Sequence, residues 1–340
     1  MWKKWMAVLW MLMLMTTASA EIISPTTGLP LDGEPTAPML AVISHTFGNT
    51  KVNGKTVQAA GVGNRQPWGG QLADIVYESL LYQDGCSRFV YLYHDALVKG
   101  EKISAGPIRS VRSVHIELSK AWNAGLIFSA GTDTSTPTLA DVWDRSYTLS
   151  IDHARPYFEN VKRKAPDCRS ADVGGMHGLM ENKAFTSAGF AFTDDAPDAA
   201  LPSGTALHIT WGDDRTLKQV WTTHLTYDAE SGQYLCFSGK APLKTFHDAT
   251  FTEESQFAFD NVIVQYAAHS FPTRMLADVD MTSGGKAVIL RRGKRVDAQW
   301  VSENGQTKFV DEAGNEVPLS RGKTYIALWD EKDIGELSWE

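Results

Sequence analysis

Two short segments place charged residues inside patterns that otherwise predict buried secondary structure. In the first (QLADIVYE), branched and aromatic residues typical of a strand lie between Asp74 and Glu78. In the second (GPIRSVRS), a Gly-Pro pair interrupts regular structure just before Arg109 and Arg112. A charge held inside regular structure needs a partner or a ligand. We therefore expect the first half of the chain to hold these two segments close together.

A helix is predicted over residues 110–123. Ser110 is a suitable N-cap, and Gly125 stands where a glycine often follows a helix. The apolar residues at helical spacing are Val111, Val114, Leu118, Ala121 and Trp122. Arg109 and Arg112 would then lie at the positive end of the helix. Free backbone N–H groups, the helix dipole and two guanidinium groups together favour phosphate or carboxylate there.

These charges support two interpretations. In one, the arginines bind an anionic ligand in a cleft whose far wall carries Asp74 and Glu78. In the other, an arginine pairs with one of these carboxylates and only braces the fold. The candidate binding residues are Asp74, Glu78, Arg109, Arg112, Arg65 and His177.

The rest of the first half alternates short strands with polar loops. Residues 39–43 and 126–129 are apolar runs that predict buried strands, and residues 88–94 form the clearest strand pattern. A turn at Asp84 and Gly85 predicts that the strand before it pairs with the strand after it.

A polar stretch, residues 151–183, is expected to be a long surface excursion. Pro156, Pro166 and a Gly-Gly pair interrupt it. It also contains several basic residues and His177. These suggest a ligand, although a solvated surface is the simpler explanation.

From residue 201 onward the sequence becomes rich in strand signals. Branched and aromatic runs are separated by turn residues such as Gly293 and Gly314. The predicted strands are residues 206–211, 225–227, 234–237, 261–266, 287–290, 296–300 and 324–329. This pattern predicts a β-rich second domain.

The first twenty residues predict a cleaved secretory signal. Lys3 and Lys4 form a positive start, residues 5–15 form an apolar core too short to span a bilayer, and residues 18–20 (ASA) form a cleavage site. The alternative is a retained N-terminal anchor. Residues 21–38 contain four prolines and are expected to form an extended tether.

Removing the signal would leave 320 of the 340 residues, which is long for one core. Two domains are therefore expected, at residues 39–199 and 200–340. The formal charge would change from −8 to −10, because the signal contains two lysines and no acid. This charge argues against nucleic acid as a partner. Cys86, Cys168 and Cys236 allow at most one internal disulfide and match no metal-binding spacing.

Several motifs occur in an order that resembles a known family. In the first half they are residues 64–70, 73–78, 88–89, 106–112 and the surroundings of His177. In the second half they are residues 261–264, 284–287, 292–294, 322–325 and Trp300. This order is similar to that of the YerB-like family, also called the DUF3048 family, whose members are exported and often lipid-anchored proteins of Gram-positive bacteria. The resemblance covers nearly the whole chain after the signal.

The resemblance implies an α+β fold, with a layered mixed sheet and helices (sheet-sheet-helix) in the N-terminal domain and a β-rich C-terminal domain. It implies a location outside the cytoplasm, secreted or in the cell envelope, and no established biochemical role. The chain departs from the family in two places. No lipid-acceptor cysteine precedes Cys86, which puts membrane anchoring in doubt. Gly178 stands where an asparagine often follows the histidine, which weakens a histidine-asparagine site at His177.

The expected function is binding rather than catalysis. Serine-hydrolase, zinc-protease and phosphate-loop motifs are absent from the sequence, and an S-x-x-K match at residues 283–286 falls in a predicted turn. We expect no cofactor, no metal and no transmembrane span after signal cleavage. The expected partner is an anionic small molecule, an envelope polymer or another protein.

The alternative function is an envelope enzyme that acts on a phosphate-linked polymer or a lipid phosphate. An acid on one strand with arginines after the next is loosely similar to the LytR-CpsA-Psr phosphotransferases. In those enzymes arginines grip a pyrophosphate and a carboxylate holds magnesium. Metal and arginine together would offset the charge that develops during phosphoryl transfer.

Overall fold

A computed structural model describes residues 21–45, 47–52, 55–60, 66–82, 85–131, 140–148, 156–214, 219–273, 276–332 and 335–340. The strands up to residue 200 are β1 Ile22–Ile23, β2 Pro30–Leu31, β3 Met39–Ser44, β4 Phe47–Val52, β5 Lys55–Ala60, β6 Ile75–Tyr82, β7 Gly85–Tyr93, β8 Ser104–Ala105, β9 Gly125–Phe128, β10 Ser146–Thr148, β11 Phe158–Asn160, β12 Arg169–Asp172 and β13 Phe192–Thr193. The helices are α1 Asp95–Val98, α2 Ser113–Trp122 and α4 Val173–Gly178, with 3-10 turns η1 Gly70–Leu72 and η3 Ala140–Arg145.

The later strands are β14 Ala206–Asp214, β15 Gln219–Asp228, β16 Gln233–Ser238, β17 Ala241–Pro242, β18 Lys244–Phe246, β19 Glu254–Gln256, β20 Ala258–Phe259, β21 Asn261–Tyr266, β22 His269–Thr273, β23 Leu276–Val279, β24 Gly285–Arg291, β25 Lys294–Glu303, β26 Gln306–Val310, β27 Leu319–Ser320, β28 Thr324–Trp329 and β29 Glu336–Trp339. The predicted strands of the second half are confirmed by β14, β15, β16, β21, β24, β25 and β28.

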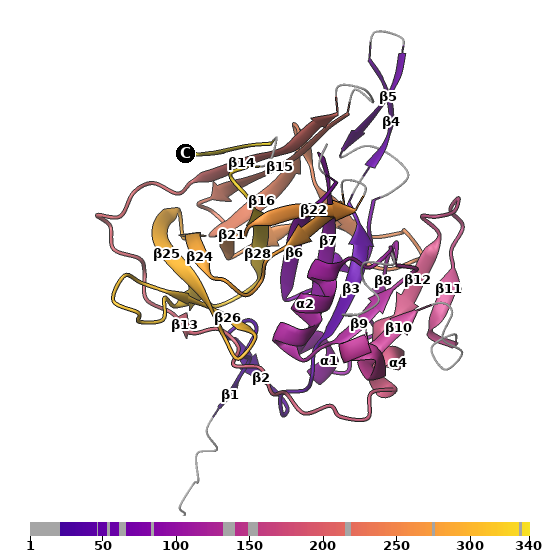
Figure 1. The fold of residues 1–340 in the computed structure, drawn as a ribbon, viewed down its shortest axis with the longest axis horizontal. Helices are drawn as coiled ribbons and strands as arrows, with labels where there is room; N and C mark the ends of the chain where they lie inside the picture. Colours follow the sequence, from indigo (N-terminus) through magenta and orange to yellow (C-terminus); the bar gives the residue numbers. More distant parts are fainter. Residues whose placement is uncertain are drawn as a thin grey trace, which may run out of the picture.

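Strands from both halves of the chain build one twelve-stranded sheet through the middle of the molecule (Figure 1). Its main order is β10-β9-β3-β7-β6-β28-β21-β24-β25-β26, and β23 joins it at β6. The halves meet where β6 runs parallel to β28, from Ile75 opposite Thr324 to Ser79 opposite Leu328. Strand β28 therefore supplies the main-chain partners that this edge of β6 lacks within its own half.

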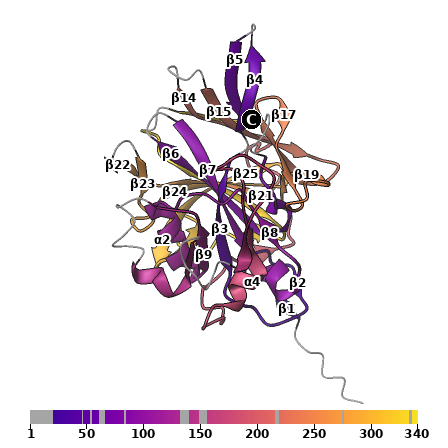
Figure 2. The same cartoon turned by 90° about the vertical axis from the view of Figure 1, so that its right-hand side faces the viewer.

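Alternate residues along the strands point to opposite faces of this sheet. On β7, Phe89 and Tyr91 belong to one buried apolar cluster, whereas Val90 and Leu92 belong to another. The first cluster includes apolar residues of a six-stranded sheet containing β14, β15 and β16, and the second includes the apolar side of α2. We call these two faces the sheet face and the helix face. In Figure 2, α2 and the β14–β15 pair lie on opposite sides of β7.

The expected α+β class, with a layered sheet and helices in the N-terminal domain, is wrong, because the protein is mostly β-sheet. Among the described residues, α2 is the only α-helix with more than six residues. The first-half strands β3, β6 and β9 are nearly continuous apolar runs, buried on both faces. Such runs hide the alternation that marks a strand, and their partners in the second half are remote in sequence.

The predicted helix exists but begins later than expected. It covers Ser113–Trp122, with Arg112 rather than Ser110 at the N-cap and Asn123 in a left-handed conformation at the C-cap. Gly125 begins the next strand instead of ending the helix. The predicted hairpin is confirmed by the antiparallel pairing of β6 with β7.

Two segments expected to be irregular pack against the body of the protein. In residues 21–38, β1 pairs with β2, and Ser24, Thr26 and Thr27 are buried. In residues 151–183, β12 pairs with β8 and β11, and the core includes residues of α4. Internal hydrogen bonds satisfy polar groups that the sequence suggested would face water. The predicted signal lies outside the described residues, and the division into two domains at residue 199 stays a prediction.

A buried carboxylate, Glu78, connects the two large sheets. It lies on the sheet face of β6 and is 0% exposed. Its oxygens accept hydrogen bonds from Tyr325 of β28 at 2.6 Å, from Thr223 of β15 at 2.9 Å and from Ser87 of β7. His45 Nε2 lies 3.5 Å from the carboxylate. These donors offset the cost of burying a polar group and fix the spacing between the sheets.

Replacing Tyr325 with phenylalanine should lower the free energy of unfolding by about 1–3 kcal/mol, because it removes a donor from this buried carboxyl group. Urea denaturation of the two proteins measures the difference. The matched control is Tyr91→Phe. The Tyr91 hydroxyl is also buried but makes no hydrogen bond with the described residues, so its loss should leave the unfolding free energy almost unchanged. Equal losses in the two variants would contradict this role for Glu78.

Candidate functional site

The predicted site residues do not meet in one cleft. Arg65 lies outside the described residues. Glu78 is buried between the two large sheets. Asp74 immediately precedes Ile75, the first residue of the same strand, β6. Arg109 and Arg112 precede α2 on the helix face, and Arg109 pairs with Asp167 rather than with either predicted carboxylate. The two predicted carboxylates therefore do not adjoin these arginines.

Three arginines gather where α2 begins: Arg88 of β7, Arg109 and Arg112. We call them the arginine cluster. Arg88 Nη1 donates to the Ser110 carbonyl at 2.9 Å, and Arg112 Nη1 donates to the Val111 carbonyl at 2.7 Å. Burial, with the charges of Arg112 and Arg109 nearby, lowers the pKa of Arg88 to about 9. The three guanidinium groups are therefore close enough to repel one another.

Two members of the arginine cluster are buried without an opposite charge. Arg88 is 6% exposed and Arg112 is 8% exposed. Within the described part of the chain, neither pairs with a carboxylate, and Arg112 Nε has no hydrogen-bond partner. Arg109 pairs with Asp167 at 3.0 Å, so one of the three charges is balanced, although by neither of the carboxylates that the second interpretation named. The cluster therefore keeps an excess of positive charge.

The start of α2 adds to this positive potential. The Arg112 backbone N–H donates to Nδ1 of His115 at 3.0 Å. Burial and the arginines Arg88 and Arg112 lower the pKa of His115 well below its usual value, so this ring stays neutral. An acid is also present, since Asp278 of β23 accepts a hydrogen bond from the Ser113 hydroxyl at 2.5 Å. Asp278 contacts the hydroxyl and forms no ion pair with Arg88 or Arg112.

The structure adds Arg88 to the residues predicted from sequence. Its signal in the sequence is an arginine that begins the run Phe89 to Tyr93, the clearest strand pattern of the first half. It occupies the same side of β7 as Val90 and Leu92, which places it on the helix face. The alternation of side chains along β7 could predict that Arg88 lies on the helix face. Its closeness to Arg112 could not be predicted in the same way, because it depends on where α2 begins.

Asp74 belongs to a separate buried group at the beginning of β6. One of its oxygens accepts hydrogen bonds from the backbone N–H groups of His94 and Asp95 at 2.7 and 2.9 Å and from the Thr26 hydroxyl at 3.1 Å. Asp95 accepts hydrogen bonds from Ser24 and Thr27, each at 2.6 Å. The two carboxylates thus hold the N-terminal segment against the body.

Three residues of this group, Asp74, His94 and Asp95, offer ligand atoms within 4.8 Å of one another, a spacing that a metal ion could bridge. Several of these atoms already have partners. His94 Nδ1 lies 2.8 Å from Asp95, both Asp95 oxygens accept hydrogen bonds from hydroxyl groups, and one Asp74 oxygen accepts three hydrogen bonds, whereas His94 Nε2 has no partner among the described residues. We therefore interpret the group as a latch for residues 21–38 rather than as a metal centre.

His177 lies on α4 and contacts neither the arginine cluster nor Glu78. Its Nε2 lies 3.0 Å from the Thr36 hydroxyl. Burial, with Lys183 nearby, lowers the pKa of His177. These contacts explain the residue as part of the packing of α4 against residues 36–37.

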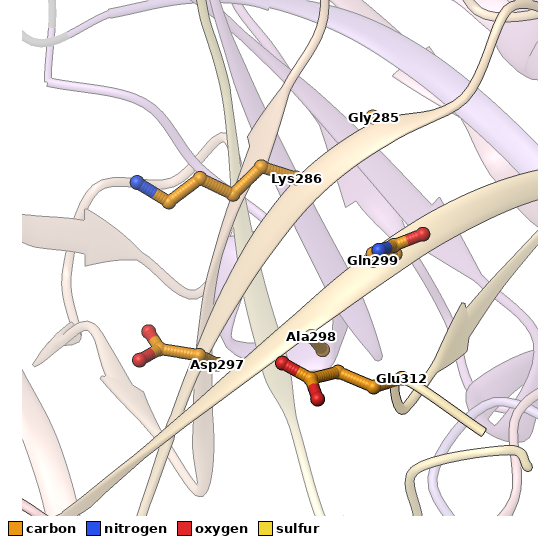
Figure 3. Close-up of a pocket in the computed structure, with 6 residues that line it drawn as sticks. All are labelled: Gly285, Lys286, Asp297, Ala298, Gln299 and Glu312. Atoms are coloured by element: carbon orange, nitrogen blue, oxygen red, sulfur yellow. The ribbon is translucent and has the colours of Figure 1, made fainter. Parts of the chain in front are cut away.

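Two hollows of the described surface are lined by residues outside the arginine cluster. One, of about 410 Å³, is lined by Lys286, Asp297, Glu312 and neighbours on β24 and β25, and Figure 3 shows these side chains spread along its rim. Lys286 already stacks on Tyr266, with 4.6 Å from Nζ to the ring centre. Another, of about 530 Å³, lies between residues 159–162 and residues 248–251. We assign no ligand to either hollow.

The latch should make stability depend on pH through Asp74. Burial, and the charge of Asp95, raise the pKa of Asp74 from 3.8 to about 7. A raised pKa means that the folded state holds the proton more tightly. The contribution of Asp74 to the free energy of unfolding is therefore complete below pH 4, and it is lost as the pH rises to about 7. Between pH 4.5 and pH 8, the free energy of unfolding should fall by roughly 2–4 kcal/mol less in Asp74→Asn than in the unchanged protein. Urea denaturation across this pH range measures the difference.

Asp198→Asn is the control, because Asp198 is exposed. Its curve should follow that of the unchanged protein. Parallel curves for Asp74→Asn and the unchanged protein would contradict the assigned role of Asp74.

Comparison with known proteins gives the relationships of the chain. Residues 61–186 match the family model described as the N-terminal domain of a protein of unknown function, DUF3048, and residues 203–326 match the corresponding C-terminal domain. A Bacillus subtilis (strain 168) protein named "Putative lipoprotein YerB" is 22% identical over 280 residues, which cover 78% of this chain and 77% of that protein.

The crystal structure of YerB from Bacillus subtilis superposes with a TM-score of 0.73 at 18% identity, covering 94% of this chain and 100% of that structure. This likeness concerns the fold. Among the described residues, no helix is long and apolar enough to cross a membrane. The two matched domains, in the same order and over most of the chain, show that this protein belongs to the DUF3048 family.

Proposed function

We propose that this protein is a non-catalytic protein of the cell envelope that binds a phosphate or carboxylate group through the arginine cluster. Support for the location comes from the predicted secretory signal and from the name of the relative, "Putative lipoprotein YerB". Support for the binding comes from the charges of Arg88, Arg109 and Arg112.

The observation that carries the proposal is the burial of unpaired positive charge. Arg88 and Arg112 are both more than nine-tenths buried, and neither has a carboxylate partner in the described structure. Holding such charges together in a desolvated place costs several kcal/mol, as the lowered pKa of Arg88 also indicates. A bound anion would remove the repulsion and satisfy the free Nε of Arg112.

The chemistry of the cluster favours a group with several oxygens. A guanidinium group presents planar pairs of donors that match two oxygens of one phosphate or carboxylate. The first turn of α2 adds backbone N–H groups that have no partner within the helix. Because His115 stays neutral, it adds no charge of its own and serves to hold Arg112 in place.

Arg112→Gln should weaken the binding of inorganic phosphate or pyrophosphate by about 10-fold or more, because one charge-assisted hydrogen bond contributes about 1.5–3 kcal/mol. Titration calorimetry measures this directly. Thermal denaturation gives a second reading, since a ligand that binds only the folded state raises the melting temperature. Arg88→Gln should have the same effect, and Arg112→Lys should restore only part of the affinity.

Lys240→Ala is the control for a general loss of positive charge, because Lys240 is exposed in the turn after β16. It should leave both readings unchanged. If phosphate, pyrophosphate, a teichoic acid fragment and a peptidoglycan peptide all bind the folded Arg112→Gln variant as tightly as the unchanged protein, or if none binds the unchanged protein, the proposal fails.

A further inference from the structure

Two histidines on neighbouring strands face each other across the outer side of the six-stranded sheet. His208 of β14 and His224 of β15 are direct partners in the antiparallel register. Their Nδ1 atoms lie 3.0 Å apart, and their ring centres lie 4.9 Å apart. Both rings are partly exposed, in contrast to Leu207 and Ile209, which point into the core.

We propose that His208 and His224 form a binding site for a divalent transition metal ion, with both Nδ1 atoms as ligands. Histidine nitrogens bind such ions at about 2.0–2.1 Å. Two nitrogens 3.0 Å apart would then subtend about 94° at the ion. This angle is close to the 90° of the square arrangement typical of Cu²⁺ and Ni²⁺. Water would complete the coordination, because the rings border solvent.

The surroundings of His208 fit a metal ligand. A histidine that binds a metal through one nitrogen usually donates its other N–H group to a carboxylate, which orients the ring. Glu340 Oε1 lies 3.4 Å from Nε2 of His208, on the side away from His224 Nδ1. Glu336 pairs with Thr210, two residues along β14 from His208 and on the same side of the sheet, which adds negative potential near the pair.

The protonation of the pair also suits binding. Without metal, the Nδ1–H group of one ring donates to the Nδ1 of the other, so the accepting ring is neutral. Burial, and then the neighbouring His208, lower the pKa of His224, so this ring is neutral at physiological pH. Metal binding requires only that the shared proton move to Nε2 of the same ring. The site therefore needs no large structural change, unlike the latch at Asp74, one of whose oxygens already accepts three hydrogen bonds.

Untagged protein titrated with Cu²⁺ and with Zn²⁺ should bind one ion per chain at this site, with Cu²⁺ tighter, as the Irving–Williams order expects. His208→Gln and His224→Gln should each abolish this binding. Glu340→Gln should weaken it by about 10-fold, because it removes the outer carboxylate. The electron paramagnetic resonance spectrum of the Cu²⁺ complex should show coupling to two imidazole nitrogens.

His247→Gln is the matched control. The His247 side chain is 37% exposed against 36% for His208, and it also faces a glutamate, but its partners among the described residues include no second histidine. It should bind metal as the unchanged protein does. Binding that survives in both His208→Gln and His224→Gln would overturn the proposal, and so would an absence of binding in the unchanged protein.

A further experiment uses the unchanged protein, so its result does not depend on whether the variants fold. Diethyl pyrocarbonate should modify His208 and His224, and bound Zn²⁺ should block the reaction at both, as mass spectrometry of the peptides shows. Equal modification with and without Zn²⁺ would overturn the proposal as well.

Discussion

The parallel pairing of β6 with β28 is the constraint on which the rest of the structure depends. It joins a strand that ends at Tyr82 to one that begins at Thr324, so the central sheet cannot be completed from either half alone. The same pairing brings the Tyr325 hydroxyl to Glu78, while Thr223 reaches that carboxylate from the opposing sheet. Contacts so distant in sequence carry the entropic cost of closing a long loop.

The alternation of side chains across this sheet explains why Glu78 and the arginines do not line one cleft. Glu78 shares its side of the sheet with Phe89 and Tyr91, whereas Arg88 shares its side with Val90 and Leu92. Neighbouring positions on paired strands are close in space but open onto different layers. The carboxylate and the arginines are therefore separated by the sheet. Residues 106–109 lie beside β3, and β7 lies between β3 and β6.

The sequence could predict elements whose signal is local. The second-half strands combine branched residues with turn signals, and the α2 residues Val114, Leu118 and Trp122 carry the helical period. The sequence could not predict hydrogen-bond partners that are brought together by the pairing of strands distant along the chain. Nothing near Glu78 indicates that its donors come from residues 223 and 325, and nothing near Ser24 indicates a bond to Asp95. The prolines of residues 21–38 favoured a tether for the same reason, because the segment's partners lie elsewhere.

Counting the partners of each buried charge distinguishes structural roles from binding roles. Glu78 receives hydrogen bonds from three hydroxyl groups, and the latch carboxylates Asp74 and Asp95 receive them from hydroxyl and backbone groups. Such groups need nothing further, and their loss should affect stability. Among the described residues, Arg88 and Arg112 have only backbone carbonyls as partners, which cannot balance a full positive charge. A buried charge left in this state is stabilised most by an external anion, and this makes the start of α2 the place where binding is expected.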